Sequence, residues 1–351
     1  MLGTGDEPVP RLNSVADYVR IGERGAIVLG TLCVDGHENS CLFRVVTHMH
    51  SDHIIDLRKS IAACLGIIAT PETHALLEEL GYKIPRSKRF ELKYRSKSVL
   101  DNLELVLEKS KHIVGSCQVL VRNRDMGVEI GYTGDFKDPG VGTPVLKPDV
   151  LVIDATYGHP SYVRVSSSVA VNAFVDLVKV GLREGPVYVY AYHGKLQEAM
   201  SILRDHGVDA PFLTSYRIWK MTWRLRDFGL EINDLFYRGS PEGAEVEKSG
   251  WYVYFDHFSQ FWKREGLGSL DGGSTHILLT GWLFRKAVRR LSHGSWMVAL
   301  SDHADFVELV RYVEESRPQL LIVDGFRGGA AAKAFAEYVE KNLGIKAVVL
   351  P

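Results

Sequence analysis

The heptapeptide THMHSDH, residues 47–53, decides the fold of this chain. It places three histidines and an aspartate directly after the apolar run LFRVV. Side chains alternate along an extended segment, so His48 and His50 point the same way. Asp52 and His53 follow them at once. This set of donors suits borderline divalent metals such as zinc, and its division into two pairs indicates two adjacent metals rather than one.

A helix is expected to begin near Ser51, directly behind the first two histidines. Asp52 and His53 then lie in its first turn, where a carboxylate suits the positive end of the helix dipole. The alternative is accidental clustering, because the chain has 13 histidines to distribute. The alternation followed by an adjacent pair favours a metal-binding loop over that alternative.

The composition is that of an ordinary globular protein. A length of 351 residues predicts two domains, or one large domain with an insertion. The formal net charge of -1 means that any polyanionic partner must be held by local basic patches. Hydrophobic residues make up 46% and charged residues 24%, which allows a sizeable core.

The cysteines and the hydropathy pattern restrict the compartment. Cys33, Cys41, Cys64 and Cys117 are widely spaced, so we expect neither a thiolate zinc site nor a disulfide framework. The first residues lack the basic and apolar regions of a signal peptide, and no run approaches 18 apolar residues. We therefore expect an intracellular, cytoplasmic protein that makes no membrane contact.

The chain reads as strands that alternate with helices, which predicts the α/β class. Buried strands are expected at 25–34, 41–48, 126–134, 149–157, 186–192, 296–301 and 319–325. Helices are expected at 70–82, at 166–185, from 194 onward, at 305–315 and at 329–343. Thr70 and Pro71 are the expected cap and first residue of the first of these helices. From about residue 166 the sequence pattern changes to a regular alternation of strands and helices. No low-complexity linker marks this change, which indicates an insertion that packs tightly against the rest of the chain.

Further metal-binding side chains are expected at other strand ends. His112 lies in SKHIVGS, Asp135 in GYTGDF and His303 in ALSDHADF. Taken singly, each has an ordinary reading as a loop histidine, a turn aspartate or a residue beside a helix cap. Their order after THMHSDH makes the combination specific.

These motifs resemble the β-CASP nucleic-acid hydrolases of the metallo-β-lactamase superfamily. The resemblance also rests on VIDATYG (152–158), YHGKLQEAM (192–200), LLTGWLFRKAVRR (278–290) and LLIVDG (320–325), and it runs from about residue 25 to the end. It is strongest toward ligase-associated exonucleases and the DNA cross-link repair nucleases related to Artemis. It implies a metallo-β-lactamase αββα sandwich interrupted by an inserted β-CASP α/β domain. The implied boundaries are 1–165 and 300–351 for the sandwich and 166–299 for the insertion.

The resemblance also implies roles for the site residues. His48, His50 and His112 would hold a first zinc, and Asp135 would bridge to a second metal. Asp52 and His53 would hold that second metal, with Asp52 also counted as catalytic. His303 would act as the general acid and Asp154 would orient its ring.

One position departs from the pattern of the RNA-cleaving relatives. Their strand corresponding to LIVDG ends in a histidine that completes the second metal site, whereas this chain has Asp324. The carboxylate could ligate the metal directly, ligate it through water, or favour Mg²⁺ or Mn²⁺ over Zn²⁺. The Artemis-related branch has an apolar residue there and holds one metal firmly.

Several residues are expected to contact nucleic acid. Gly194 and Lys195 lie where a strand passes into a helix, which is typical of a phosphate site. Aromatic and basic residues are mixed in YRIWKMTWRLR (216–226) and GWLFRKAVRR (281–290), as in grooves for single strands, although the first stretch could equally bury its tryptophans. The complete predicted set is Thr156, Tyr157, Gly194, Lys195, Trp282, Arg285, Lys286, Arg289 and Arg290.

The resulting hypothesis is a metal-dependent phosphodiesterase, a 5′→3′ DNA exonuclease in repair or end processing, with structure-specific endonuclease activity as an extension. An RNA-processing nuclease of the same architecture is the alternative, because few contacts to the 2′ position separate the two. A catalytically weak scaffold is a third reading, which the intact metal set disfavours. DNA-repair proteins are candidate partners.

Overall fold

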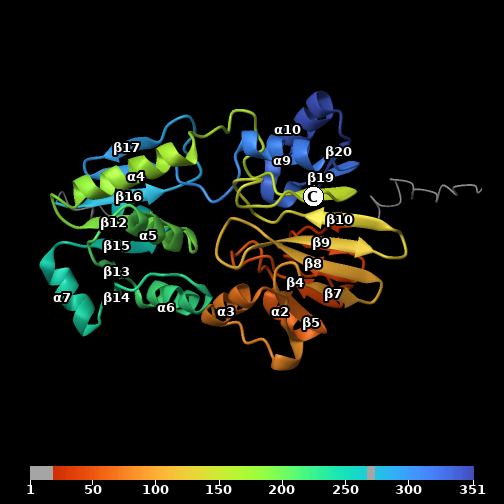
Figure 1. Cartoon of the computed structure of the whole chain (residues 1–351), viewed down its shortest axis with the longest axis horizontal. Helices are drawn as coiled ribbons and strands as arrows, with labels where there is room; N and C mark the ends of the chain where they lie inside the picture. Colours follow the sequence, from red (N-terminus) through yellow and green to blue (C-terminus); the bar gives the residue numbers. More distant parts are fainter. Residues whose placement is uncertain (1–18, 267–272) are drawn as a thin grey trace, which may run out of the picture.

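The computed structural model describes residues 19–266 and 273–351, and its strands form three sheets (Figure 1). The first is a 6-stranded sheet in the order β1 to β6. Its strands are β1 (Val19–Ile21), β2 (Ile27–Leu29), β3 (Leu32–Val34), β4 (Phe43–Val45), β5 (Gly66–Ala69) and β6 (Arg89–Glu91). The pairs from β3 to β6 are parallel, so β4 delivers the THMHSDH loop at one edge of the sheet.

The second sheet combines strands from residues 97–153 with the last two strands of the chain, at 320–350. It has seven strands in the order β20-β19-β11-β10-β9-β8-β7. They are β7 (Lys97–Leu100), β8 (Leu103–Lys109), β9 (Cys117–Asn123), β10 (Val128–Tyr132), β11 (Val150–Ile153), β19 (Leu320–Asp324) and β20 (Ala347–Leu350). β11 pairs in parallel with β19, so residues near 154 and near 324 emerge side by side.

The first two sheets pack face to face. Strand β8 alternates between buried and partly exposed residues, and Leu103, Leu105 and Leu107 point into the shared core with Val45 and Ile68 of the first sheet. This alternation is the period of two that a sheet with one buried face requires.

Helices cover the outer face of each of these sheets, so the architecture is αββα. They are α2 (Leu57–Ala63) and α3 (Pro71–Glu79) on the first sheet, and α9 (Phe306–Ser316) and α10 (Gly325–Leu343) on the second. Strand β11 is buried along its whole length, because α9 and α10 pack on its outer face while the other sheet packs on its inner face. That position explains its continuous apolar run.

The third sheet lies beside the sandwich, on the left of Figure 1. Its order is β14-β13-β15-β12-β16-β18-β17, and every pair is parallel except β17 with β18. Its strands are β12 (Val187–Ala191), β13 (Phe212–Thr214), β14 (Leu235–Tyr237), β15 (Val253–His257), β16 (Thr275–Leu279), β17 (Val288–Ser292) and β18 (Ser295–Val298). The accompanying helices are α4 (Ser167–Gly181), α5 (Lys195–Asp205), α6 (Tyr216–Leu225), α7 (Pro241–Ser249) and α8 (Phe258–Gly266). Short 3₁₀ turns occur at η1 (Arg86–Lys88) and η2 (Arg226–Phe228).

Helix starts follow the sequence signals closely. Thr70 accepts a hydrogen bond from the amide of Thr73, and Pro71 is the first residue of α3, as predicted. Asp305 caps α9 and forms a capping box with Glu308. This helix, expected at 305–315, is observed at Phe306–Ser316, and its cap is Asp305 rather than Ser301 or Asp302.

Three local predictions were wrong. Residues 25–34 form two antiparallel strands, β2 and β3, because Gly30 turns the chain with a positive φ of 62°. The helix after THMHSDH begins at Leu57 rather than near Ser51, so Asp52 and His53 lie in turns before it. Cys33 and Cys41 form a disulfide, since the turn between β3 and β4 brings their Cα atoms to 5.7 Å.

Within the described part of the chain, no helix combines the length and apolar character that crossing a membrane needs.

Candidate metal centre

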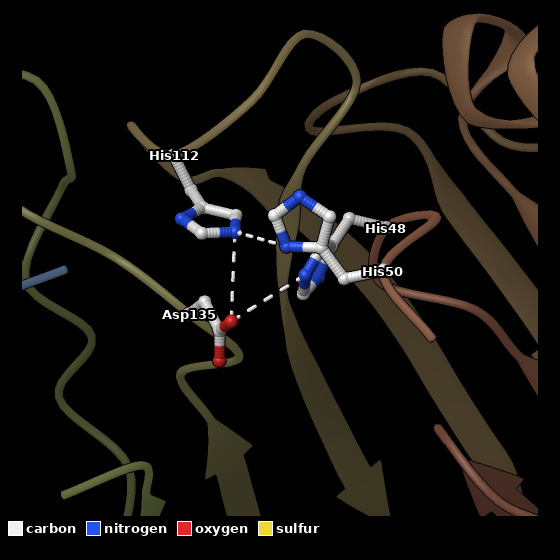
Figure 2. A group of neighbouring side chains, drawn as sticks. All are labelled: His48, His50, His112 and Asp135. Carbon is white, nitrogen blue, oxygen red and sulfur yellow. Dashed lines mark hydrogen bonds and ion pairs between the residues drawn. The ribbon is translucent and has the colours of Figure 1, made fainter. Parts of the chain in front are cut away.

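The candidate ligands come from loops that follow the carboxyl ends of strands in both sheets of the sandwich. His48 and His50 follow β4, His112 follows β8, and Asp135 follows β10. The ligand atoms of these four buried residues all lie within 4.8 Å of one another. Figure 2 shows the three imidazoles and the carboxylate converging on one point. Residues more than 80 positions apart in the sequence thus meet at one end of the sandwich.

The distances from Asp135 to its histidine neighbours are long for hydrogen bonds but suit ligands around an ion. Asp135 Oδ2 lies 3.4 Å from His48 Nε2 and 3.5 Å from His112 Nε2. His112 Nε2 lies 3.0 Å from His50 Nδ1. His48 Nε2 is buried and has no hydrogen-bond partner. A buried polar atom of this kind is costly unless something else satisfies it.

Hydrogen bonds outside the cluster fix which ring nitrogen faces inward. His50 Nε2 donates to the carbonyl of His193 at 2.9 Å, and His112 Nδ1 donates to the carbonyl of Asp302 at 2.9 Å. Carbonyl oxygens only accept, so the inward nitrogens of both rings carry lone pairs that face each other. A cation between them removes that repulsion, and the donor set of three imidazoles and a carboxylate fits zinc.

Burial keeps these imidazoles neutral, the form that binds a metal. Burial lowers the pKa of His112 to about 3. It also lowers the pKa of His48 well below the usual value, and the charges of His53 and His112 add to the effect. Burial opposes ionisation of Asp135, but His53 and His303 hold the pKa of its carboxyl well below its usual range. The cluster is therefore neutral histidine around a carboxylate.

Asp52 and His53 form a second group beside the first. His53 Nε2 is buried without a hydrogen-bond partner and lies 3.2 Å from Asp135 Oδ1 and 3.3 Å from Asp52 Oδ2. Asp135 thus stands between His48 and His53, as a bridging carboxylate would. The carboxylate of Asp52 is half exposed, with 49% of its side-chain surface accessible.

Two buried charged residues that the sequence reasoning missed hold this loop in place. The Asp35 carboxylate accepts hydrogen bonds from Thr47 N at 2.8 Å, from Thr47 Oγ1 at 2.6 Å and from His53 Nδ1 at 2.7 Å. Arg44 donates to the carbonyls of His53 at 3.0 Å and Ile55 at 2.9 Å. The available signal was a lone arginine inside the apolar run LFRVV, because a buried arginine needs acceptors.

Replacing Asp35 with asparagine should weaken metal binding about 10–100-fold, the usual cost of losing a carboxylate that orients a ligating histidine. The reason is that the amide can no longer accept all three hydrogen bonds, so it no longer fixes His53 or Thr47, whose Oγ1 lies 3.1 Å from His48 Nδ1. Competition with a chromogenic chelator measures the affinity. Unchanged affinity would show that Asp35 does not position the residues that hold the metal.

His303 lies beside Oδ2 of Asp135, whereas His53 lies beside Oδ1, and Asp154 lies beside the other ring nitrogen of His303. His303 Nδ1 is 3.5 Å from Asp154 Oδ2, and His303 Nε2 is 3.6 Å from Asp135 Oδ2. Burial opposes the charged ring, but the carboxylates of Asp135, Asp154 and Asp302 outweigh it and raise the pKa of His303 to about 9. The ring is therefore protonated at neutral pH, unlike its neighbour His112.

Asp324 does not face the metal centre as a free ligand. One of its oxygens caps α10 by accepting from Phe326 N at 3.0 Å and Arg327 N at 3.3 Å. The other pairs with Arg327 Nη1 at 2.7 Å. A histidine in place of Asp324 could not form this pair with Arg327. Arg327, which the sequence did not point to, therefore explains why this chain has an aspartate where the RNA-cleaving relatives have a histidine.

The predicted phosphate site at Gly194 and Lys195 is also corrected. Gly194 N donates to Gln197 Oε1 at 2.8 Å, so this amide already has an acceptor. Lys195 is buried, and its Nζ pairs with Asp302 Oδ1 at 2.7 Å and Leu300 O at 3.0 Å. Lys195 thereby holds the loop that carries His303, because a buried lysine is stable only when paired.

A cavity of about 640 Å³ opens over the metal centre. His50, Asp52, Asp135 and His303 form part of its wall. Thr156 and Tyr157, two of the residues predicted to contact nucleic acid, also line it. The rest of the wall is rich in aromatic rings: Tyr157, Tyr192, Phe258, Trp262, Trp282 and Phe326. Trp282 is 58% exposed, and its ring lies 4.9 Å from that of Tyr157. Large exposed rings around a polar centre offer surfaces on which bases can stack.

The two basic stretches differ in their surroundings. Arg285, Lys286, Arg289 and Arg290 are all exposed, at and before β17 at the edge of the third sheet, and lie outside the cavity wall. In α6, Trp219 donates to the carbonyl of Leu235, whereas Trp223 is 51% exposed under the Arg226 guanidinium. Helix α6 therefore partly buries one of its two tryptophans and exposes the other, so the alternative that this stretch buries its tryptophans holds for Trp219 but not for Trp223.

No family model matches the chain. An uncharacterised protein from the lig 3′ region of Acidianus ambivalens is 43% identical over 139 residues, which cover 40% of this chain and 99% of the relative. A probable DNA ligase of Opitutus terrae is 24% identical over 328 residues, or 86% of this chain. The DNA cross-link repair protein SNM1 of Arabidopsis thaliana is 24% identical over 326 residues, again 86% of this chain. The chain belongs to the β-CASP branch of the metallo-β-lactamase superfamily.

The alignment lengths limit what these relatives say about this β-CASP protein. The chain spans 29% of the ligase and 63% of the SNM1 protein. A solved structure of a protein of unknown function from Enterococcus faecalis V583 has a TM-score of 0.60 and 15% identity, and covers 88% of this chain and 79% of its own. That likeness supports the fold alone. The predicted metallo-β-lactamase fold with a β-CASP α/β domain is confirmed.

Proposed function

We propose that this β-CASP protein is a metal-dependent phosphodiesterase that hydrolyses nucleic acid. The observation that carries the proposal is the convergence of buried ligand atoms from His48, His50, His112 and Asp135 beneath an aromatic-walled cavity. Relatives named for DNA ligation and DNA cross-link repair support the choice of nucleic acid as substrate. The intact ligand set argues against a purely scaffolding role.

His48, His50, His112 and Asp135 would hold the first metal, for which zinc is the best fit. Asp52 and His53, together with Asp135, are the residues that would hold a second, more weakly bound cation, for which Mg²⁺ or Mn²⁺ is an alternative. A divalent metal supplies positive charge to the phosphodiester and lowers the pKa of water from 15.7 to about 7.

His303 is the proposed general acid. Its protonated ring stands 3.6 Å from Asp135, so a phosphodiester bound at the centre would present its leaving oxygen nearby. Asp154 positions the ring through Nδ1, and Thr156 Oγ1 donates to Asp154 Oδ1 at 2.9 Å, which fixes that carboxylate in turn. This chain of contacts leaves Nε2 as the nitrogen that delivers the proton.

Within this proposal, the preferred reaction is 5′→3′ exonuclease action on DNA. The exposed rings of Trp282, Trp262 and Tyr192 favour unpaired bases over a duplex. Polarity and the choice of DNA rest on the resemblance to ligase-associated and cross-link repair nucleases. An intracellular location and DNA-repair partners belong to the same proposal. The proposed insertion, 166–299, contains every strand of the third sheet.

Digestion of matched 5′-labelled strands tests this proposal. DNA and RNA of one sequence are offered single-stranded, with and without a 5′ phosphate, to zinc- or manganese-loaded protein. Release of labelled mononucleotides from DNA supports 5′→3′ exonuclease action. Preferential cleavage of RNA would show that RNA, not DNA, is the substrate. Label that stays on long fragments would show internal cutting instead of digestion from the 5′ end.

Neutralising Arg285, Lys286, Arg289 and Arg290 with glutamine should weaken nucleic-acid binding and flatten its salt dependence. Each lost phosphate contact should reduce the log–log slope by about 0.7 on single strands or 0.9 on duplex. Fluorescence anisotropy across a salt series measures the slope. The control is glutamine at Lys333, Lys341 and Lys346, which are exposed and lie outside the cavity wall. An equal effect of the control would show that the four basic residues act only as general surface charge.

A further inference from the structure

Arg327 is a buried arginine with most of its hydrogen-bonding capacity already used. It lies in the first turn of α10, and only 3% of its side chain is accessible. Nη1 donates to Asp324 Oδ2 at 2.7 Å and to Gly25 O at 3.2 Å. Nη2 donates to Asp52 O at 3.0 Å and to Asp35 O at 3.3 Å. The guanidinium is therefore held rigidly against the metal-binding loop.

The remaining donor of Arg327 has no acceptor. Nε is buried and lacks a hydrogen-bond partner, and it stands 3.9 Å from Asp52 Oδ2. Arg327 lines the same cavity as His50, Asp135 and His303. A buried charged donor left unpaired costs free energy that a ligand oxygen would recover. A planar guanidinium is the side chain best suited to bind a phosphate oxygen.

The position of this donor matters because of what Asp324 does. In a site with two metals, the second cation clamps the phosphodiester and neutralises its growing charge. Asp324 is committed to capping α10 and to Arg327, so it does not complete a ligand set with Asp52 and His53. In its place Asp324 holds the guanidinium of Arg327, with Nε beside Asp52 at 3.9 Å from Oδ2.

We propose that Arg327 is a catalytic residue that supplies the positive charge of a second metal, with Nε–H donating to a non-bridging oxygen of the scissile phosphate. One metal, at His48, His50, His112 and Asp135, is then sufficient for turnover. This inference rests on the proposed function. It extends that function by assigning to Arg327 the positive charge that a two-metal site obtains from its second ion.

The test uses Arg327→Met combined with Asp324→Asn. The asparagine keeps the oxygen that caps α10 and avoids leaving a buried carboxylate without its partner. Arg327→Lys is a second variant that keeps the charge but removes Nε–H. Arg311→Met is the matched control, because Arg311 pairs with Glu315 on the exposed face of α9. Melting temperatures establish that each variant is folded.

Three quantities decide the proposal: tightly bound metal per chain by mass spectrometry, affinity for inorganic phosphate by calorimetry, and kcat on a labelled strand. We expect one tight metal in the wild type and in all variants. Phosphate should bind about 10–100-fold more weakly to the double variant, and kcat should fall about 10²–10³-fold, as for the loss of one preorganised donor. Arg327→Lys should show an intermediate loss.

Two tightly bound metals per wild-type chain would overturn the proposal. A folded double variant with one metal and unchanged phosphate affinity and kcat would overturn it as well. A wild-type protein that binds phosphate through Arg327 but hydrolyses no strand would instead remove the proposed function, since the phosphate measurement does not depend on turnover.

Discussion

Replacing Asp135 with alanine should reduce hydrolysis to the rate without enzyme. Asp135 lies beside four histidines of the centre: His48 at 3.4 Å, His112 at 3.5 Å, His53 at 3.2 Å and His303 at 3.6 Å. Its loss removes a metal ligand and the carboxylate that stabilises the His303 charge. Losing a residue that only orients a ligand weakens metal binding by up to about 100-fold, so losing a ligand itself should weaken it more. Losing a general acid slows turnover by up to about 10⁴-fold, and the loss of Asp135 should slow it further.

The measurements are bound metal per chain and initial rates with saturating zinc. Asp227→Ala is the control, because that carboxylate is exposed and pairs with Arg224 away from the centre. Full activity in Asp135→Ala would mean that the four-residue cluster does not hold the catalytic metal.

Replacing His303 with alanine should lower kcat about 10²–10⁴-fold while the bound metal stays in place. The His303 ring lies 3.5 Å from Asp154 and 3.6 Å from Asp135, and it packs edge-on against His112 with ring centroids 4.9 Å apart. His50 and His112 are oriented instead by hydrogen bonds to the carbonyls of His193 and Asp302, so the proposed ligands should keep their positions without His303. Rates are compared for a strand with its natural leaving oxygen and for a nitrophenyl phosphodiester, whose leaving group needs no proton. The activated substrate should lose much less.

His206→Ala serves as the control, because His206 is exposed and donates only to the carbonyl of Ile202 at the end of α5. An empty metal site in His303→Ala would make this residue a ligand, and equal losses on both substrates would remove its role as an acid.

The sequence was sufficient for the parts of the site that lie in short, ordered motifs. THMHSDH already implied that His48 and His50 share a direction, and the structure brings their rings to a centroid distance of 4.7 Å. His112 and Asp135 were recognised through their order along the chain, and they complete the cluster. The fold followed from the same motifs together with strand–helix alternation and well-placed caps.

The residues that surround the cluster could not be found this way, because their partners are distant in the sequence. Arg327 reaches Gly25, Asp35 and Asp52 across 275 positions or more. The position of Lys195 at a helix start predicted that it binds phosphate, yet its Nζ forms an ion pair with Asp302 at 2.7 Å. Asp324 had the right position for a ligand, and only the packing of α10 on β19 shows that Arg327 takes its carboxylate. Pairing of buried charges is a tertiary property that local patterns do not report.

The dependence of strand hydrolysis on metal is the most direct test of the central claim. Protein stripped with a chelator is titrated with zinc or manganese while release of nucleotides from a 5′-labelled DNA strand is followed. We expect no hydrolysis in the stripped protein and full recovery near one equivalent of metal per chain, with no recovery in Asp135→Ala at the same concentration. Hydrolysis by the metal-free protein, or none at any metal concentration, would contradict it.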